Sequence, residues 1–154
     1  MGTIRIVQKL VILLNQTPHC SFMRGYFFSF MDQKAKDHFE KANKQLQKAN
    51  EELFKPKEDV VSYLVCKNAL FAIENYLKGY LSHRGFETKT NDSLELLLER
   101  CRLLDKKFNQ IDFSVIDCSS QPDHNRYCED IDKVNSCFQT ADHLENFLIK
   151  KGIV

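Results

Sequence analysis

One stretch of the sequence, Asp59 to His83, carries apolar and aromatic residues at helical spacing through about seven turns. The apolar stripe is wider than the seam of a two-stranded coiled coil, because leucines extend it on both sides. The polar positions are few: Lys67, Glu74, Asn75 and Lys78. A helix with so little polar surface has to be covered on several sides. We therefore predict a central helix here, packed against other helices or a second copy of the chain.

Composition places the chain among ordinary globular proteins. It has 154 residues, which is one domain in size, and a formal net charge of +1. So small a charge gives no reason to expect strong, sequence-independent affinity for phosphates, but it leaves room for a local basic patch. No C-x-x-C pair occurs among the six cysteines. This pattern favours reduced thiols in a cytoplasmic protein over a disulfide framework.

The composition changes sharply near Met31. Residues 1–30 contain no acidic side chain, whereas the sequence that follows is rich in Lys, Glu and Gln. The apolar run from Leu10 to Leu14 is too short to span a bilayer, so no membrane association is expected. We divide the chain into an N-terminal extension, 1–30, and a helical domain, 31–154. The extension is a packed element, a targeting tail, or sequence upstream of a native start at Met31, and the last interpretation is favoured.

Three further helices are predicted around the central one. The first runs from Gln33 to Phe54 and is stopped by Lys55-Pro56-Lys57. Its polar outer face is interpreted as solvated surface because acids are interleaved with its lysines. A short third helix is capped by Asp92, with Glu95 completing a capping box. The last runs from about Arg126 to Lys151. The expected buried residues of these three helices are Ala35, Phe39, Ala42, Leu46, Ala49, Leu53, Leu94, Leu97, Leu98, Cys101, Leu104, Ile131, Val134, Phe138, Ala141, Leu144 and Leu148.

Together these helices predict an all-α fold, an up-and-down antiparallel four-helix bundle. The 106–120 segment is a loop with at most one short fifth helix, anchored by apolar residues such as Phe108 and Ile111. Gly85 is expected to cap the central helix, and Gly152 the last one, because a helix C-terminus often needs a left-handed residue.

The order and spacing of four segments resemble the HEPN family over about residues 33–150. These segments are Ala69-x3-Ile73-Glu74-x2-Leu77-Lys78-x2-Leu81, the Gly85 turn, Asp92-Ser93-Leu94-x2-Leu97-Leu98, and Arg126-Tyr127-x-Glu129-Asp130. The resemblance implies a helical bundle, commonly a homodimer. The family includes RNA-cleaving toxins, nucleotide-binding modules and non-catalytic partners of minimal nucleotidyltransferases.

Enzymatic members of that family carry an arginine followed, after four to six residues, by a histidine in the last helix. After Arg126 the corresponding positions hold Ile131, Asp132 and Lys133, and no other arginine of the chain has a histidine at this spacing. The Arg-Tyr pair 126–127 matches the start of the last helix in many non-toxin relatives, although Cys128 replaces their usual proline. The missing pair favours a protein that does not cleave RNA.

The expected function is therefore a non-catalytic HEPN-like module associated with nucleotides or RNA, or with a nucleotidyltransferase, in a toxin–antitoxin-like or stress-related setting. A divergent HEPN ribonuclease and a homodimeric interaction scaffold are the alternatives. Arg126, Tyr127 and Lys78 are the candidate ligand- or partner-binding residues, and no catalytic residue is assigned. No cofactor or metal is expected, because the chain has no P-loop and the spacing of Cys118, His124 and Cys128 matches no structural zinc pattern.

Overall fold

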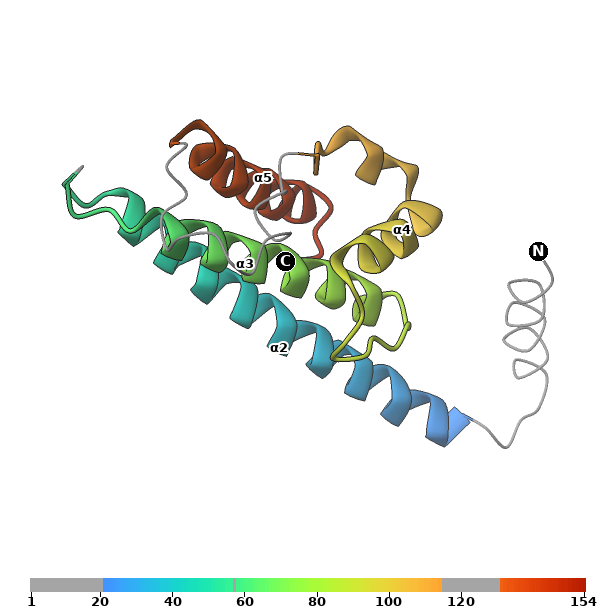
Figure 1. Cartoon of the computed structure of the whole chain (residues 1–154). Coiled ribbons are helices and arrows are strands. Elements are labelled where there is room, and N and C mark those ends of the chain that lie inside the picture. Colours follow the sequence, from blue (N-terminus) through green and yellow to red (C-terminus); the bar gives the residue numbers. More distant parts are fainter. Residues whose placement is uncertain (1–20, 57, 115–130) are drawn as a thin grey trace.

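The chain is built from α-helices. The computed structural model describes residues 21–56, 58–114 and 131–154. Side chains are described from Asp32 onward in the first range and from Asp132 onward in the last. The described residues form α2 (Ser21–Leu53), α3 (Ser62–His83), α4 (Leu94–Leu104), a short 3-10 helix η3 (Lys106–Gln110) and α5 (Ile131–Lys150) (Figure 1). No strand occurs within these ranges. The prediction of an all-helical chain is confirmed, and η3 is the short helix expected after residue 106.

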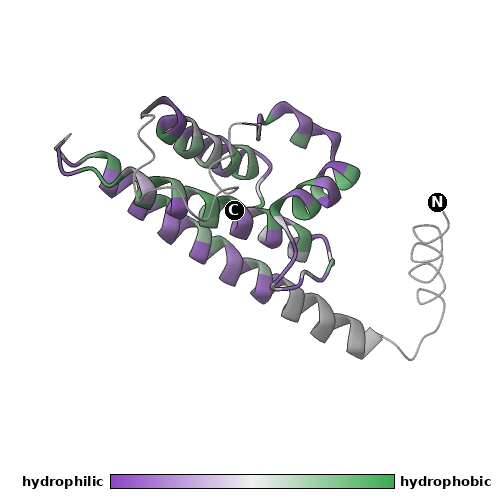
Figure 2. Ribbon diagram, in the orientation of Figure 1, coloured by the Kyte–Doolittle hydropathy of each residue, from purple (hydrophilic) through white to green (hydrophobic). Residues whose placement is uncertain are grey.

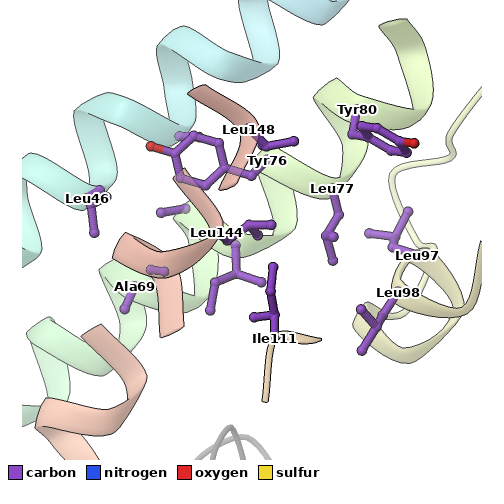
Figure 3. Close-up of a cluster of buried hydrophobic side chains, with 14 of the residues drawn as sticks. Leu46, Ala69, Tyr76, Leu77, Tyr80, Leu97, Leu98, Ile111, Leu144 and Leu148 are labelled. Carbon is purple, nitrogen blue, oxygen red and sulfur yellow. The ribbon is translucent and has the colours of Figure 1, made fainter. Parts of the chain in front are cut away.

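Helix α3 is the central helix, as its apolar stripe predicted, and Figure 2 shows the hydrophobic residues along it. Helix α2 lies along its length, and α4 and α5 also pack against it (Figure 1). From Tyr76 to Ser82 every residue of α3 is buried, because three helices cover this half. Figure 3 shows Tyr76, Leu144 and Leu148 meeting in this core, with Leu97 and Leu98 approaching from α4.

Small residues let α2 and α3 approach closely. Ala35, Ala42 and Ala49 recur at intervals of seven on α2 and are almost fully buried. On α3, Gly79 lies under the ring of Phe39, so close that a Cβ atom built on this glycine would be 2.4 Å from the ring carbon Cε1. Real Cβ atoms essentially never come so near another atom, so only glycine fits beneath this ring.

Helix α2 begins at Ser21, well before the predicted start at Gln33. The change of composition near Met31 is therefore not a break in the helix. The physical reason is that Ser21–Leu53 contains no proline, and the prolines nearest to it are Pro18 and Pro56.

The connection between α2 and α3 is held by Glu52, a buried carboxylate. Its Oε1 accepts a hydrogen bond from the backbone N–H of Val61 at 2.9 Å, and its Oε2 binds Lys55 Nζ at 2.6 Å. The hydrogen bond from Lys55, with the one from Val61, holds the pKa of Glu52 below its usual range. The turn at Pro56 thus brings α3 back antiparallel along α2.

The cap of α4 differs from the prediction by one residue. Ser93, rather than Asp92, is the N-cap, and its Oγ accepts a hydrogen bond from the backbone N–H of Leu96 at 3.3 Å. Asp92 instead accepts the backbone N–H of Lys89 at 2.9 Å and pairs with Arg100 Nη1 at 3.1 Å. Both residues are good N-caps. The carboxylate is used in the preceding turn, which leaves the serine to cap the helix.

Both predicted glycine caps are confirmed. Gly85 and Gly152 have φ of 82° and 66°, in the left-handed region. After each glycine the next N–H reaches back to the carbonyl five residues earlier, from Phe86 to Leu81 at 2.9 Å and from Ile153 to Leu148 at 3.1 Å. This is the Schellman arrangement, which satisfies carbonyls at the end of a helix.

The segment after α4 is anchored by Phe108, which is fully buried. Its ring meets Tyr80 at 4.7 Å and Phe147 at 4.9 Å between centroids, in edge-to-face geometry. Asp105 pairs with Lys151 beside this cluster. These contacts join η3 to α3 and α5. The apolar residues Val115 and Ile116, and Ile131, which was expected to be buried, lie outside the described side chains.

The thiols of Cys66, Cys101 and Cys137 are buried in the core. Cys101 Sγ lies 3.8 Å from the carbonyl oxygen of Leu77, and burial raises its pKa to about 12. A thiol with so high a pKa is almost entirely protonated at neutral pH and is a poor nucleophile. Cys101 is therefore a structural residue of the core, where it was expected to be buried.

Candidate functional site

The three candidate residues from the sequence are not brought together in the described part of the chain. Arg126 and Tyr127 lie outside the described residues. Lys78 lies on α3, where it is only 7% exposed and its Nζ binds Glu74 Oε1 at 2.5 Å. Lys78 is thus neutralised and largely covered, which differs from its predicted place in a polar outer strip. By itself it is not an open binding residue.

Beside Lys78, a histidine and an asparagine join α2 to α3. His38 Nδ1 lies 3.1 Å from Asn75 Oδ1, and Asn75 Nδ2 donates to the carbonyl oxygen of Phe71 at 2.8 Å. The second bond fixes which end of the amide faces the histidine, because a flipped amide would set two oxygens against each other. His38 therefore carries its proton on Nδ1 and donates to Asn75. The lone pair of neutral His38 is on Nε2, on the far side of the ring.

The surroundings of His38 keep it neutral. Burial is the largest cause that lowers its pKa, and the positive charges of Lys41, Lys78 and Lys34 lower it further against the opposing hydrogen bond with Asn75. Lys34 and Lys41 flank His38 on α2, one turn before and one turn after it, and Lys78 approaches from α3. Three cations from two helices therefore converge on one imidazole.

The same side of α2 continues this basic character. Residues 34, 38, 41, 45 and 48 are spaced four, three, four and three apart, so they form one stripe along the helix. The stripe contains three lysines and no acidic residue. Across from it, α3 exposes Lys67 and two aromatic rings, Tyr63 and Phe71, which are 47% and 48% exposed. Lys67 Nζ lies 5.8 Å from the centre of the Tyr63 ring.

This stripe lies on the side of α2 that faces away from α5. On the opposite side, Asn43 Oδ1 accepts a 2.7 Å hydrogen bond from the hydroxyl of Tyr76. Burial raises the pKa of Tyr76, and the carboxylates of Glu145 and Asp142 on α5 raise it further. Asn43 therefore marks the flank of α2 next to α5. The stripe that carries His38 is left uncovered by that helix.

Asp92, in the connection between α3 and α4, also senses the charge of Lys78. The backbone N–H of Lys89 is the main cause that lowers the pKa of Asp92, and the charges of Arg100, Lys89 and Lys78 lower it further. Asp92 and Arg100 form their own ion pair. The carboxylates near Lys78 are thus each held by a cation, and the lysines of α2 beside them are not neutralised.

Among the residues whose structure is described, no three His, Cys, Asp or Glu side chains gather in a way that could hold a metal ion. The loop residues Cys118, His124 and Cys128, which were weighed as a zinc site, lie outside the described ranges.

Sequence reasoning missed the pairing of His38 with Asn75 and treated the histidine as an undistinguished helix residue. The signal was nevertheless present. These two residues are equally far from the turn near Pro56, and so are Glu52 and Val61. An antiparallel helical hairpin places such residues opposite each other. Folding the predicted helices about Pro56 would have placed the pair correctly.

We expect acid to destabilise the protein partly through His38. Its pKa is lowered in the folded state, so the unfolded chain binds the proton more readily. The stability that follows is present above the unfolded pKa of about 6.5 and is lost as pH falls through the lower folded value. In urea unfolding between pH 7 and pH 5, His38→Gln should lose less stability than the wild type. His143→Gln, at an exposed position of α5, should behave as the wild type does; equal slopes for all three proteins would contradict this assignment.

Comparisons with protein-family models, with curated proteins and with solved structures find no match to this chain. In the described part of the chain, no helix has both the length and the apolar character that crossing a bilayer requires.

Proposed function

We propose that the chain is a non-catalytic HEPN-like module, folded as an up-and-down antiparallel four-helix bundle and acting in the cytoplasm. It associates with nucleotides or RNA, or serves a minimal nucleotidyltransferase partner in a toxin–antitoxin-like or stress-related system. The observation that carries the proposal is the stripe of α2 on which Lys34, Lys41 and Lys48 lie on the same side as His38, outside any ion pair of the described residues. Lysines gathered in one stripe suit phosphate groups, although the net charge of the chain is only +1.

Two features favour binding over cleavage. The arginine–histidine spacing of the ribonuclease members is missing from the sequence. His38 does have an oriented imidazole, but it sits on α2 at the interface with α3, and the HEPN motif belongs to the last helix. A general base also needs a substrate hydroxyl within reach and a partner acid or phosphate clamp in fixed geometry. Around His38 the described side chains supply lysines and an amide.

The test is to incubate the purified full chain with cellular RNA, with and without Mg²⁺, and to follow RNA length on denaturing gels. We expect intact RNA, and a shift of the RNA in native gels or of nucleotide in equilibrium dialysis. Specific cleavage that a single substitution in α5 abolishes would overturn the non-catalytic assignment and establish the divergent ribonuclease. The control is Glu95→Gln, a substitution on α4 that leaves α5 unchanged.

A second candidate, the homodimeric interaction scaffold, is favoured by the exposed leucines of α4. Leu96 and Leu103 are seven residues apart, so they share one side of the helix, and Leu103 is 69% exposed. We expect light scattering to give twice the chain mass at micromolar concentration, and Leu103→Glu to give the monomer mass. A monomer over the whole concentration range would remove the dimer from the proposal. Phe54→Glu, at a more exposed position directly after α2, is the control.

A further inference from the structure

The hairpin of α2 and α3 has one face on which cations and exposed aromatic rings occur together. We call it the basic-aromatic face and define it by Lys34, Lys41 and Lys48 on α2 and by Tyr63, Lys67 and Phe71 on α3. From Lys34 to Lys48 the face extends about 21 Å, at ~1.5 Å of rise per residue. It is long enough to contact several successive groups of an extended ligand.

The charge of this face is only partly compensated within the described structure. Its three α2 lysines and Lys67 take part in no ion pair there. Of the nearest carboxylates, Glu74 binds Lys78 at 2.5 Å, and Asp37, one turn from both Lys34 and Lys41, accepts a hydrogen bond from Gln33 at 2.9 Å and keeps its charge. Four lysines against this one carboxylate leave the face positive, so it favours a polyanion.

The aromatic rings narrow the class of polyanion. Phe71 and Tyr63 are each about half exposed on a helix whose other half is buried, and they are two turns apart on the same side. An exposed ring gains by stacking on another flat group, and every nucleobase offers such a face. A positively charged groove or stripe with stacking rings is the common design of proteins that hold single strands without strong sequence preference. Duplexes hide their bases, and acidic peptides have few flat groups.

We propose that the basic-aromatic face binds single-stranded nucleic acid, with its lysines on the backbone phosphates and with Phe71 and Tyr63 stacked on bases. The inference rests on the proposed function and specifies its ligand and its site. His38 lies in the middle of the lysine stripe and is a neutral acceptor through Nε2. It accepts a hydrogen bond from a base or ribose hydroxyl, while Asn75 holds the ring.

The experiment measures fluorescence anisotropy of a labelled twelve-residue oligouridine with the full chain at several salt concentrations. For a single strand, log K falls with log salt by about 0.7 for each phosphate contact. The triple variant Lys34→Gln, Lys41→Gln, Lys48→Gln should lower this slope by about 2 and weaken binding at least ten-fold at low salt. Lys106→Gln, Lys107→Gln, Lys150→Gln removes the same charge from η3 and the end of α5, and it should leave slope and affinity close to wild type.

The stacking part is tested separately. Phe71→Ala should weaken binding by about 5- to 150-fold, the range that one stacked base contributes, with little change in salt slope. Phe71→Tyr should restore it, because tyrosine keeps the ring. The Phe71 side chain is about half exposed, so both variants are expected to fold. Circular dichroism checks this. Oligouridine should compete far better than an oligoglutamate peptide or a blunt duplex of equal length.

Other outcomes overturn the inference in distinguishable ways. If the wild type binds oligouridine and the two triple variants weaken it equally, RNA association stands but this face is wrong. Equal competition by oligoglutamate, with no effect of Phe71→Ala, assigns the face to an acidic protein partner. A drop to half the mass in Phe71→Ala assigns it to a second copy of the chain. No binding of oligouridine at any salt concentration removes the nucleic-acid ligand altogether.

Discussion

Replacing Phe108 by alanine is expected to lower the free energy of unfolding by about 3–5 kcal/mol, the usual cost of removing a buried phenylalanine side chain. The ring is fully buried and contacts Tyr80 and Phe147 edge to face. Its removal leaves a cavity where α3, η3 and α5 meet, and rigid neighbours cannot collapse to fill it. Urea unfolding at pH 7, followed by circular dichroism, gives the value.

The control for this variant is Phe54→Ala, which removes the same ring from a position that is 82% exposed. Surface changes of this kind usually alter stability by about 0.5 kcal/mol or less. If Phe108→Ala costs no more than Phe54→Ala, the segment after α4 is not anchored in the core. Phe108→Leu should fall between the two, because leucine refills part of the cavity.

Gly79→Ala is expected to destabilise the protein by about 1–2 kcal/mol, although alanine is the better helix former. In an open helix the exchange gains about 1 kcal/mol. Here the new Cβ would lie 2.4 Å from the ring of Phe39, and overpacking of this kind costs about 1–3 kcal/mol or more. Thermal or urea unfolding distinguishes the two signs.

A double variant shows that the loss comes from this contact. Phe39→Leu alone should destabilise moderately, and in its background Gly79→Ala should cost little or become stabilising, because the ring is gone. Additive losses would mean that α2 and α3 approach each other elsewhere. As a further control, Gly85→Ala should be destabilising whatever the partner residue, since φ is 82° and no neighbouring atom limits the space.

Hydrophobic periodicity predicted the helices because it records burial directly. The stripe of α3 identified the central helix, and the positions of α4 and of α5 from Val134 onward that were expected to be buried are buried or packed against the core. The prediction of helix boundaries failed where different sequences can form the same local structure. The start of α2 was placed too late because a change of composition was taken for a boundary, and Asp92 was preferred to Ser93 because both residues cap helices well.

Tertiary partners were beyond single-residue patterns. Phe108 was expected to anchor its segment, but the sequence could not show that Tyr80 and Phe147 would enclose it. Lys78 was expected on a polar strip, and in the structure it is largely covered and paired with Glu74. Whether Arg126 and Tyr127 contribute to binding stays a prediction.

The basic-aromatic face was also hidden in the sequence. If the polar positions of α2 are taken together as one surface, lysines and acids are mixed on it. Such a mixture predicts only a solvated surface, without a binding site. The structure divides them, because burial of the alanine seam against α3 turns Lys34, Lys41 and Lys48 to one flank and Asn43 to the other. A nearly neutral chain can therefore present a local positive surface, and the location of charges matters more than their sum.

The most direct measurement is an NMR titration of the His38 imidazole with and without oligouridine. In the free protein the pKa of His38 should be below the usual value of about 6.5, because burial and nearby lysines disfavour the charged ring. Phosphates bound to Lys34 and Lys41 bring negative charge near the ring, so the pKa of His38 should rise on binding. If oligouridine binds and the His38 signal neither shifts nor changes its pKa, the ligand is held elsewhere and the proposed site is wrong.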